Sequence, residues 1–175
     1  MARFELELDP VDHITADAIG KPGQRVFYIQ ARQGERIVTV IIEKFQLQSL
    51  AVGVEQFLAE IAERFPDLPE ASAEYDEERM HIHPPVEPLF RAGEIGLGYE
   101  RERDRILLTV RELVESEEET EEAAIVRFWC TRDQIRAMAH WGIEVAQRGR
   151  PICPQCGQPM DPEGHFCPRK NGHKH

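Results

Sequence analysis

Three cysteines near the C-terminus have the spacing of a metal site. Cys153 and Cys156 are separated by two residues, and Cys167 follows after a stretch that contains two prolines and two glycines. Paired thiolates with a nearby imidazole are the ligands that tetrahedral zinc takes in structural sites. His165, two residues before Cys167, or His173, with five residues between it and Cys167, completes the set at ligand spacings that zinc modules use. The sequence therefore predicts a bound Zn²⁺.

The predicted zinc has a structural role rather than a catalytic one. Four protein ligands fill a tetrahedral site and leave no open position for a substrate. A redox-active Cys-x-x-Cys pair would be expected to begin a helix within a βαβ unit, whereas this pair follows a predicted helix and lies among prolines. A disulfide with one spare thiol is disfavoured in a reducing compartment. Residues 149–175 are therefore expected to form a zinc-knuckle tail.

Two further pairs of residues could bind a ligand. His81 and His83 flank Ile82 in an extended run, so both imidazoles can face the same side and hold a metal ion or a proton. Lys44 and Arg132 each lie at or just before the start of a predicted helix, where free amides can receive a phosphate or carboxylate, and together they could form one anion pocket. The simpler alternatives are an exposed strand edge for the histidines, and solvation or pairing with a neighbouring acid such as Glu43 or Asp133 for the two cations.

Other chemistry is poorly represented in the chain. Cys130 is interpreted as a small buried hydrophobic residue, because no base is placed by sequence to activate its thiol. The sequence contains no phosphate-binding glycine loop, nucleophile elbow or zincin helix. An enzymatic function is therefore not favoured.

Hydrophobic periodicity predicts strands followed by a helix in each half of the chain. Alternating apolar and polar residues, or β-branched and aromatic runs, indicate strands, and apolar residues at intervals of three and four indicate helices. The expected strands are 4–9, 25–32, 36–43, 90–99, 105–113 and 123–130, and the expected helices are 47–65 and 131–148. Residues 10–23 are expected to form a loop, and 67–78 a polar connector.

The order of these elements predicts an α+β fold, with two helices packed on an antiparallel sheet in a possible duplicated βββα arrangement. The two halves would be 1–66 and 79–148, within one domain of residues 1–148. Lys44-Phe-Gln46 before the first helix echoes Arg132-Asp-Gln134 at the second, where Thr131 and Gln134 form a capping box.

Composition and charge exclude several classes of protein. The chain has 175 residues, 41% hydrophobic and 30% charged, which is close to globular averages. A net charge of −11 opposes electrostatic binding of nucleic acid or anionic lipid over a broad surface of the protein. The N-terminal residues lack the apolar stretch of a signal peptide, and no apolar run is long enough to span a bilayer. A cytoplasmic protein without a membrane partner is expected.

The tail sequence Gly-His-Phe-Cys-Pro-Arg-Lys-Asn-Gly at 164–172, after Arg-Phe-Trp-Cys-Thr-Arg-Asp-Gln at 127–134, resembles a family of uncharacterised bacterial proteins, domain of unknown function 3090. The likeness covers essentially the whole chain. The resemblance implies that His165 is the fourth zinc ligand, because the position of His173 is often aromatic in that family. It implies no reaction.

The sequence thus favours a non-enzymatic module that binds a protein partner, with zinc holding the tail. One alternative is a binder of phosphate or nucleotide ligands, or an enzyme, that uses Lys44, Arg132, His81 and His83. Another is a nucleic-acid contact through the basic tail residues Arg148, Arg150, Arg169 and Lys170. Neither the partner nor the oligomeric state follows from the sequence.

Overall fold

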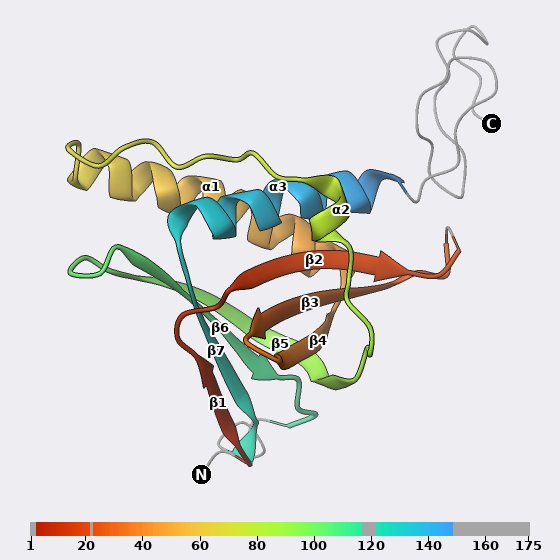
Figure 1. The fold of residues 1–175 in the computed structure, drawn as a ribbon. Coiled ribbons are helices and arrows are strands. Elements are labelled where there is room, and N and C mark those ends of the chain that lie inside the picture. Colours follow the sequence, from red (N-terminus) through yellow and green to blue (C-terminus); the bar gives the residue numbers. More distant parts are fainter. Residues whose placement is uncertain (1–2, 22, 117–121, 149–175) are drawn as a thin grey trace, which may run out of the picture.

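The computed structural model describes residues 3–21, 23–116 and 122–148 (Figure 1). Within these residues the chain forms an α+β domain, as predicted, with seven strands in one sheet and three helices. The strands are β1 (Glu5–Leu8), β2 (His13–Ile19), β3 (Val26–Gln33), β4 (Arg36–Ile42), β5 (Pro88–Glu100), β6 (Arg105–Glu112) and β7 (Ile125–Cys130). The helices are α1 (Lys44–Arg64), α2 (Glu77–Met80) and α3 (Arg132–Arg148).

The sheet is mixed, which corrects the prediction of an antiparallel sheet. Its order is β1-β7-β6-β5-β4-β3-β2, and both β1–β7 and β4–β5 are parallel pairs, whereas the other neighbours are antiparallel. The chain leaves β4 through α1 and a long connector before it enters β5, and a crossover of this length allows the chain to return in the same direction. Local sequence patterns contain no information about these two long-range pairings.

The two edge strands are consecutive in the chain, which forces the sheet to curl. Leu8 of β1 and His13 of β2 are separated by five Cα steps, which span about 18 Å at most. In a flat sheet of seven strands the edges would lie about 29 Å apart. Backbone hydrogen bonds hold the short segment that connects β1 to β2. Val11 N donates to Trp129 O (2.9 Å) in β7, and Asp12 N donates to Arg32 O (2.7 Å) in β3.

One face of the curled sheet forms the core together with α1 and α3. The inward residues of neighbouring strands are register partners, for example Ile29 with Val40 and Leu108 with Phe128, and all four are fully buried. The two helices lie side by side over this face (Figure 1). They run antiparallel, because the start of α1 packs on the end of α3 and Glu55 in the middle of α1 meets Arg136 nearer the start of α3.

Both long helices begin with the same capping geometry. At α3, Thr131 N donates to Gln134 Oε1 (2.8 Å) and Gln134 N to Thr131 Oγ1 (3.0 Å), which confirms the predicted capping box. At α1, Glu43 N donates to Gln46 Oε1 (2.8 Å) in the equivalent way. The predicted echo between the two helix starts therefore corresponds to a shared local structure. Duplication of the two halves stays a prediction. Three strands and a long helix occur in each half, as β2, β3, β4 and α1 and as β5, β6, β7 and α3, and β1 is an additional strand before the first set.

Two elements were not predicted. Residues 13–19 form β2 rather than a loop, and α2 is a short helix within the expected connector. Polar residues at 13, 15 and 17 alternate with apolar residues at 14, 16 and 18, so the period-two pattern of a strand is present in β2. The surrounding Asp, Gly and Pro residues led to the prediction of a loop.

Gly142 is the point of closest approach between the two helices. A Cβ atom at this position would lie 2.9 Å from Cδ1 of the fully buried Leu47. We predict that Gly142→Val lowers the free energy of unfolding by about 1–3 kcal/mol, because the helix pair must separate. Gly53 of α1 has nothing within 4 Å of its Cβ direction. Gly53→Ala should instead raise stability by about 0.5–1 kcal/mol, and urea denaturation compares the two variants.

Candidate functional site

The predicted zinc ligands Cys153, Cys156, His165 and Cys167, and the alternative His173, lie outside the described residues. Their assignment therefore stays a prediction. In the described part of the chain, no group of three or more His, Cys, Asp or Glu side chains is arranged to hold a metal ion. The other predicted residues are all described, and their positions follow.

Lys44 and Arg132 do not form one anion pocket. They lie in the first turns of α1 and α3, and these helices run antiparallel. Arg132 Nη1 donates to Pro69 O (2.8 Å), and Pro69 follows the far end of α1, which begins at Lys44. A helix of 21 residues is about 30 Å long, so the two cations lie at opposite ends of the helix pair.

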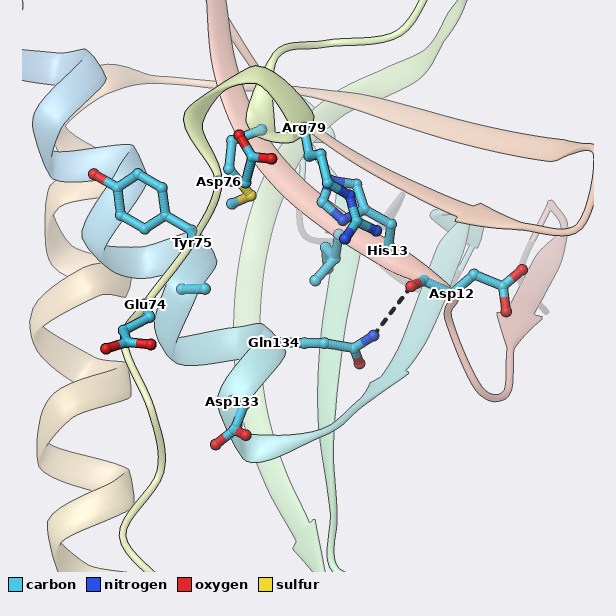
Figure 2. A pocket seen from close by; sticks show the side chains of 11 residues that line it. Asp12, His13, Glu74, Tyr75, Asp76, Arg79, Asp133 and Gln134 are labelled. Carbon is cyan, nitrogen blue, oxygen red and sulfur yellow. Dashed lines mark hydrogen bonds between the residues drawn. The ribbon is translucent and has the colours of Figure 1, made fainter.

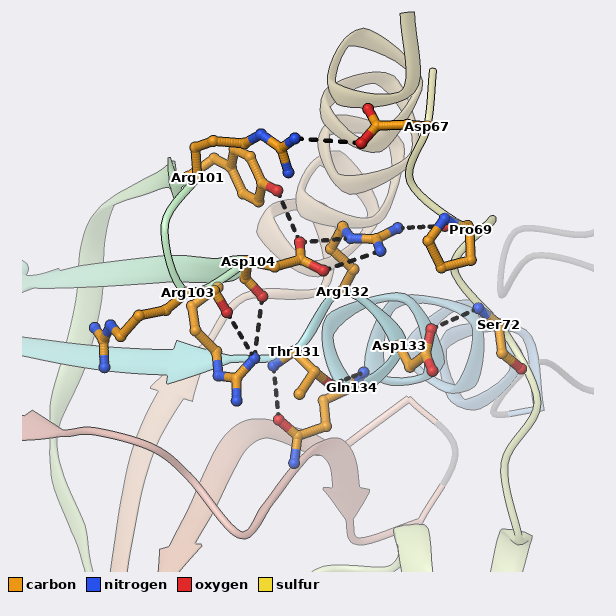
Figure 3. Close-up of polar contacts among 12 residues, drawn as sticks. Asp67, Pro69, Ser72, Arg101, Arg103, Asp104, Thr131, Arg132, Asp133 and Gln134 are labelled. Carbon is orange, nitrogen blue, oxygen red and sulfur yellow. Dashed lines mark hydrogen bonds and ion pairs between the residues drawn. The ribbon is translucent and has the colours of Figure 1, made fainter. Parts of the chain in front are cut away.

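Arg132 is engaged in a partly buried ion pair (Figure 3). Its Nε and Nη2 donate to the two carboxylate oxygens of Asp104 at 2.8 and 3.0 Å, and Tyr99 Oη donates to the same carboxylate at 2.8 Å. The hydrogen bond from Arg132 holds the pKa of Asp104 below its ordinary value. Burial and the carboxylate raise the pKa of Tyr99. This cluster ties the β5–β6 turn to the start of α3, so Arg132 has a structural role.

His81 and His83 belong to a segment that we call the strap, residues 80–87, which connects α2 to β5. The strap crosses the face of the sheet opposite α1 and α3. Asp17 Oδ2 accepts from Ile82 N (2.7 Å), while Gln30 accepts from His83 N (2.7 Å) and donates to His83 O (2.9 Å). The buried polar residues of β2 and β3 are therefore satisfied by the backbone of the strap.

The two histidine rings have different surroundings. His81 packs edge-on against Trp141 of α3, with ring centroids 5.3 Å apart, and its Nδ1 lies 3.3 Å from Asp17 Oδ2. His83 contributes its backbone to the strap contacts, and its side chain is exposed. The two imidazoles do not form part of a described metal cluster, and a ligand at either one stays a prediction.

The first half of α1 presents an exposed face without charged residues. No charged residue occurs from Phe45 to Val54. Phe45 is 66% exposed and Val52 is 56% exposed. We call this surface the α1 stripe, and its exposed members, which recur at helical spacing, are Phe45, Ser49, Val52, Gln56 and Ala59.

An apolar groove lies on each side of the α1 stripe. Between α1 and α3, a cavity of about 380 Å³ is lined mainly by Ala51, Val52, Ala139 and Ile143, with Glu55 and His140 at its rim. Between α1 and β5, a second cavity of about 380 Å³ is lined by residues such as Phe45, Gly53 and Leu97. The arrangement offers carbon surface, and both grooves are open to solvent.

A third, more polar cavity lies where the chain crosses from β1 to β2 (Figure 2). Its volume is about 290 Å³, and its lining includes His13, Tyr75, Arg79 and Gln134 over a floor that contains Ile14 and Met80. Burial lowers the pKa of His13, and the positive charges of Arg32 and Arg79 lower it further, although the carbonyl of Arg79 opposes these effects. The net effect favours the neutral form of His13. Sequence reasoning missed this cavity because residue 13 was expected in a loop.

Two other sequence interpretations can be compared with the structure. Cys130 is fully buried, and burial raises the pKa of its thiol to about 12, which confirms its interpretation as a core residue. Arg148, one of the four cations proposed to contact nucleic acid, is already paired with Glu77 and with Glu144 (3.1 Å) and stacks on Trp141. The nucleic-acid alternative therefore loses one of its cations to intramolecular contacts.

The fold and these surfaces define a single-sheet α+β protein with exposed apolar grooves, and none of its described helices has the length and apolar character to cross a bilayer. The chain belongs to the family described as protein of unknown function (DUF3090), whose model matches residues 6–167. No curated protein and no solved structure matched the chain.

The ion pair between Asp104 and Arg132 provides a stability prediction. Asp104 has φ +53°, a conformation that asparagine also adopts readily, so Asp104→Asn removes the charge without backbone strain. We expect the variant to lose about 1–3 kcal/mol at pH 7. Because the folded pKa of Asp104 lies below its ordinary 3.8, the contribution is present above that pH and is lost as the pH falls below it.

Urea denaturation at pH 7 and pH 3 measures the difference between wild type and Asp104→Asn. Asp67→Asn, which alters an exposed carboxylate 3.4 Å from Arg101, is the matched control and should cost less than about 0.5 kcal/mol. An equal loss for both variants would contradict a special role for Asp104.

Proposed function

We propose that this protein is a zinc-binding, non-enzymatic module that binds a protein partner through the α1 stripe. The observation that carries the proposal is the exposure of Phe45 and Val52 on an uncharged helix face, in a chain of which 30% is charged. Exposed apolar patches of this kind, flanked by polar residues, are typical of interaction surfaces. Aromatic residues, Phe among them, are also enriched in protein interfaces relative to the rest of the surface.

The shape of the stripe favours a helical partner segment. From Phe45 to Ala59 the stripe extends over about 21 Å, which matches roughly four helical turns of a partner. The two flanking grooves can receive apolar side chains that recur at helical spacing on such a segment. With a net charge of −11, the protein should favour a partner with basic residues around its apolar face.

The zinc-knuckle tail adds a second contact in this proposal. The supporting observation is the sequence spacing of Cys153, Cys156 and Cys167 with His165. The last described residue, Arg148, is held by Glu77, Glu144 and Trp141, so the tail begins at a fixed position on the domain. Both parts of the chain would then engage the partner together, which strengthens binding through a high effective concentration.

Affinity purification from native lysate tests the α1 stripe. The full chain should recover a partner that the double variant Phe45→Ser, Val52→Glu recovers at least tenfold less, which corresponds to about 1.4 kcal/mol of lost binding. Ala62→Glu places the same charge at an exposed position of α1 outside the stripe, and it should recover the partner as the wild type does. Equal recovery with both variants, or no specific partner with any bait, would contradict the proposal.

Metal analysis of the purified full chain tests the zinc proposal. We expect about one zinc per chain, and loss of the metal in the variant Cys153→Ser, Cys156→Ser. Cys130→Ala changes the buried cysteine outside the motif and should retain zinc. His165→Ala should lose zinc, whereas His173→Ala should not. Retention of zinc without Cys153 and Cys156 would refute the site, and a chain ending at Arg148 shows what the tail adds to partner binding.

A further inference from the structure

Apolar side chains gather on the outer face of the sheet, opposite α1 and α3. Ile19 and Val26 are register partners where β2 ends and β3 begins, and their exposed fractions are 43% and 38%. Tyr28 lies two residues beyond Val26 and therefore on the same face, and its register partner on β4 is Ile41. Both Tyr28 and Ile41 are half-buried. Neighbouring strands thus bring these four side chains together.

The strap covers only part of this face. Ile82 N donates to Asp17 Oδ2 (2.7 Å), and Asp17 is the register partner of Tyr28, so the strap passes beside the apolar residues. We call the uncovered surface the outer patch, and its members are Ile19, Val26, Tyr28, Ile41 and Ile82. Adjoining exposed apolar residues of this kind indicate a contact surface.

The described part of the chain ends next to the outer patch. Arg25 Nη2 donates to Val145 O (2.8 Å), which ties the start of β3 to the last turns of α3. His81 of the strap packs on Trp141, and Arg148 stacks on the same ring, with its Cζ 5.1 Å from the ring centroid. Figure 1 shows the end of α3 on the same side of the domain as the end of β2. The residues after Arg148 therefore begin beside the strap.

Residues 149–175, which lie outside the described residues, have the composition of a segment that needs a surface to pack on. Their large apolar residues are Ile152, Met160 and Phe166. Segments below about 40 residues rarely bury enough surface to fold alone. Four extended residues span about 14 Å at most, so a segment that begins after Arg148 can reach the strap by Ile152.

Charge and direction favour the outer patch over the α1 stripe as the surface for this segment. Residues 149–175 contain four Lys or Arg and two acids. Arg148 is paired with Glu77 of α2, where Asp76 and Glu78 are neighbouring acids. This acidic edge attracts a basic segment toward the strap. The α1 stripe offers no such attraction, because residues 45–54 are uncharged.

We infer that, in the protein without its partner, residues 149–175 dock on the outer patch, where Ile152, Met160 and Phe166 cover Ile19 and Val26. The inference goes beyond the proposed function, because it assigns an intramolecular surface to the tail. Zinc would hold the three apolar residues in one arrangement, but docking and zinc binding are separate claims. The outer patch faces away from α1, so docking leaves the α1 stripe accessible.

Nuclear Overhauser effects in the methyl-labelled full chain test the docking. We expect contacts between the methyl groups of Ile19 or Val26 and residues 149–175. A sample that mixes labelled and unlabelled chains distinguishes contacts within one chain from contacts between two. Contacts only between chains would show that a second copy covers the patch, and tail contacts with Phe45 would place the tail on the α1 stripe. Either result, or no tail contact with the patch, would overturn the inference.

Trypsin cleavage after Arg169 and Lys170 gives a second readout. In the double variant Ile19→Glu, Val26→Glu, cleavage should be about tenfold faster than in wild type, because a docked segment is cleaved only when it opens. Leu113→Glu places the same charge at a 56% exposed position outside the patch, and it should change the rate less than about twofold. Circular dichroism checks that each variant is folded, and equal rates in all three proteins would contradict docking.

Zinc content of the same samples separates this inference from the zinc proposal. A tail that binds zinc but makes no contact with the patch contradicts docking alone. A docked tail without zinc contradicts the zinc site alone. Partner recovery through the α1 stripe is measured independently of both.

Discussion

The short connection between β1 and β2 is the constraint on which the rest of the fold depends. Because four residues join the two edges of a seven-stranded sheet, the sheet must curl until those edges meet. Phe4 lies just before β1, and Phe90 lies in β5. The curl brings the centroids of their rings to 6.3 Å from each other, although two strands lie between β1 and β5. It also creates the concave face that α1 and α3 fill, and it places the His13 cavity where the edges converge.

Buried polar groups give the second face of the sheet a defined partner. Asp17 and Gln30 are almost fully buried, and each bonds to the strap backbone. Apolar residues at these positions would have packed against many segments, whereas an amide and a carboxylate accept only a backbone in the correct register. This specificity explains how an irregular segment of prolines and histidines is held in one position across the face of β2 and β3.

Local patterns predicted what depends on local interactions. The helix at 47–65, the two hairpins and the Thr131–Gln134 capping box follow from periodicity and capping chemistry, and all are present. The antiparallel helix directions, which separate Lys44 from Arg132, depend on tertiary packing. So does the partner of Arg132, because Asp104 lies 28 residues away in sequence. His13 was missed for a different reason, because the alternation of polar and apolar residues from His13 to Ala18 was assigned to a loop rich in Asp, Gly and Pro.

The pairing of β1 with β7 has a consequence for synthesis of the chain. The first strand can find its place only after Ile125–Cys130 has left the ribosome, so β1 waits while more than a hundred residues are added. During that interval β2, β3, β4 and α1 can assemble from contacts that are near in sequence, whereas closure of the sheet is a late, non-local step. A nascent chain stalled before β7 would therefore expose Leu6 and Leu8, and such a chain is a natural substrate for chaperones.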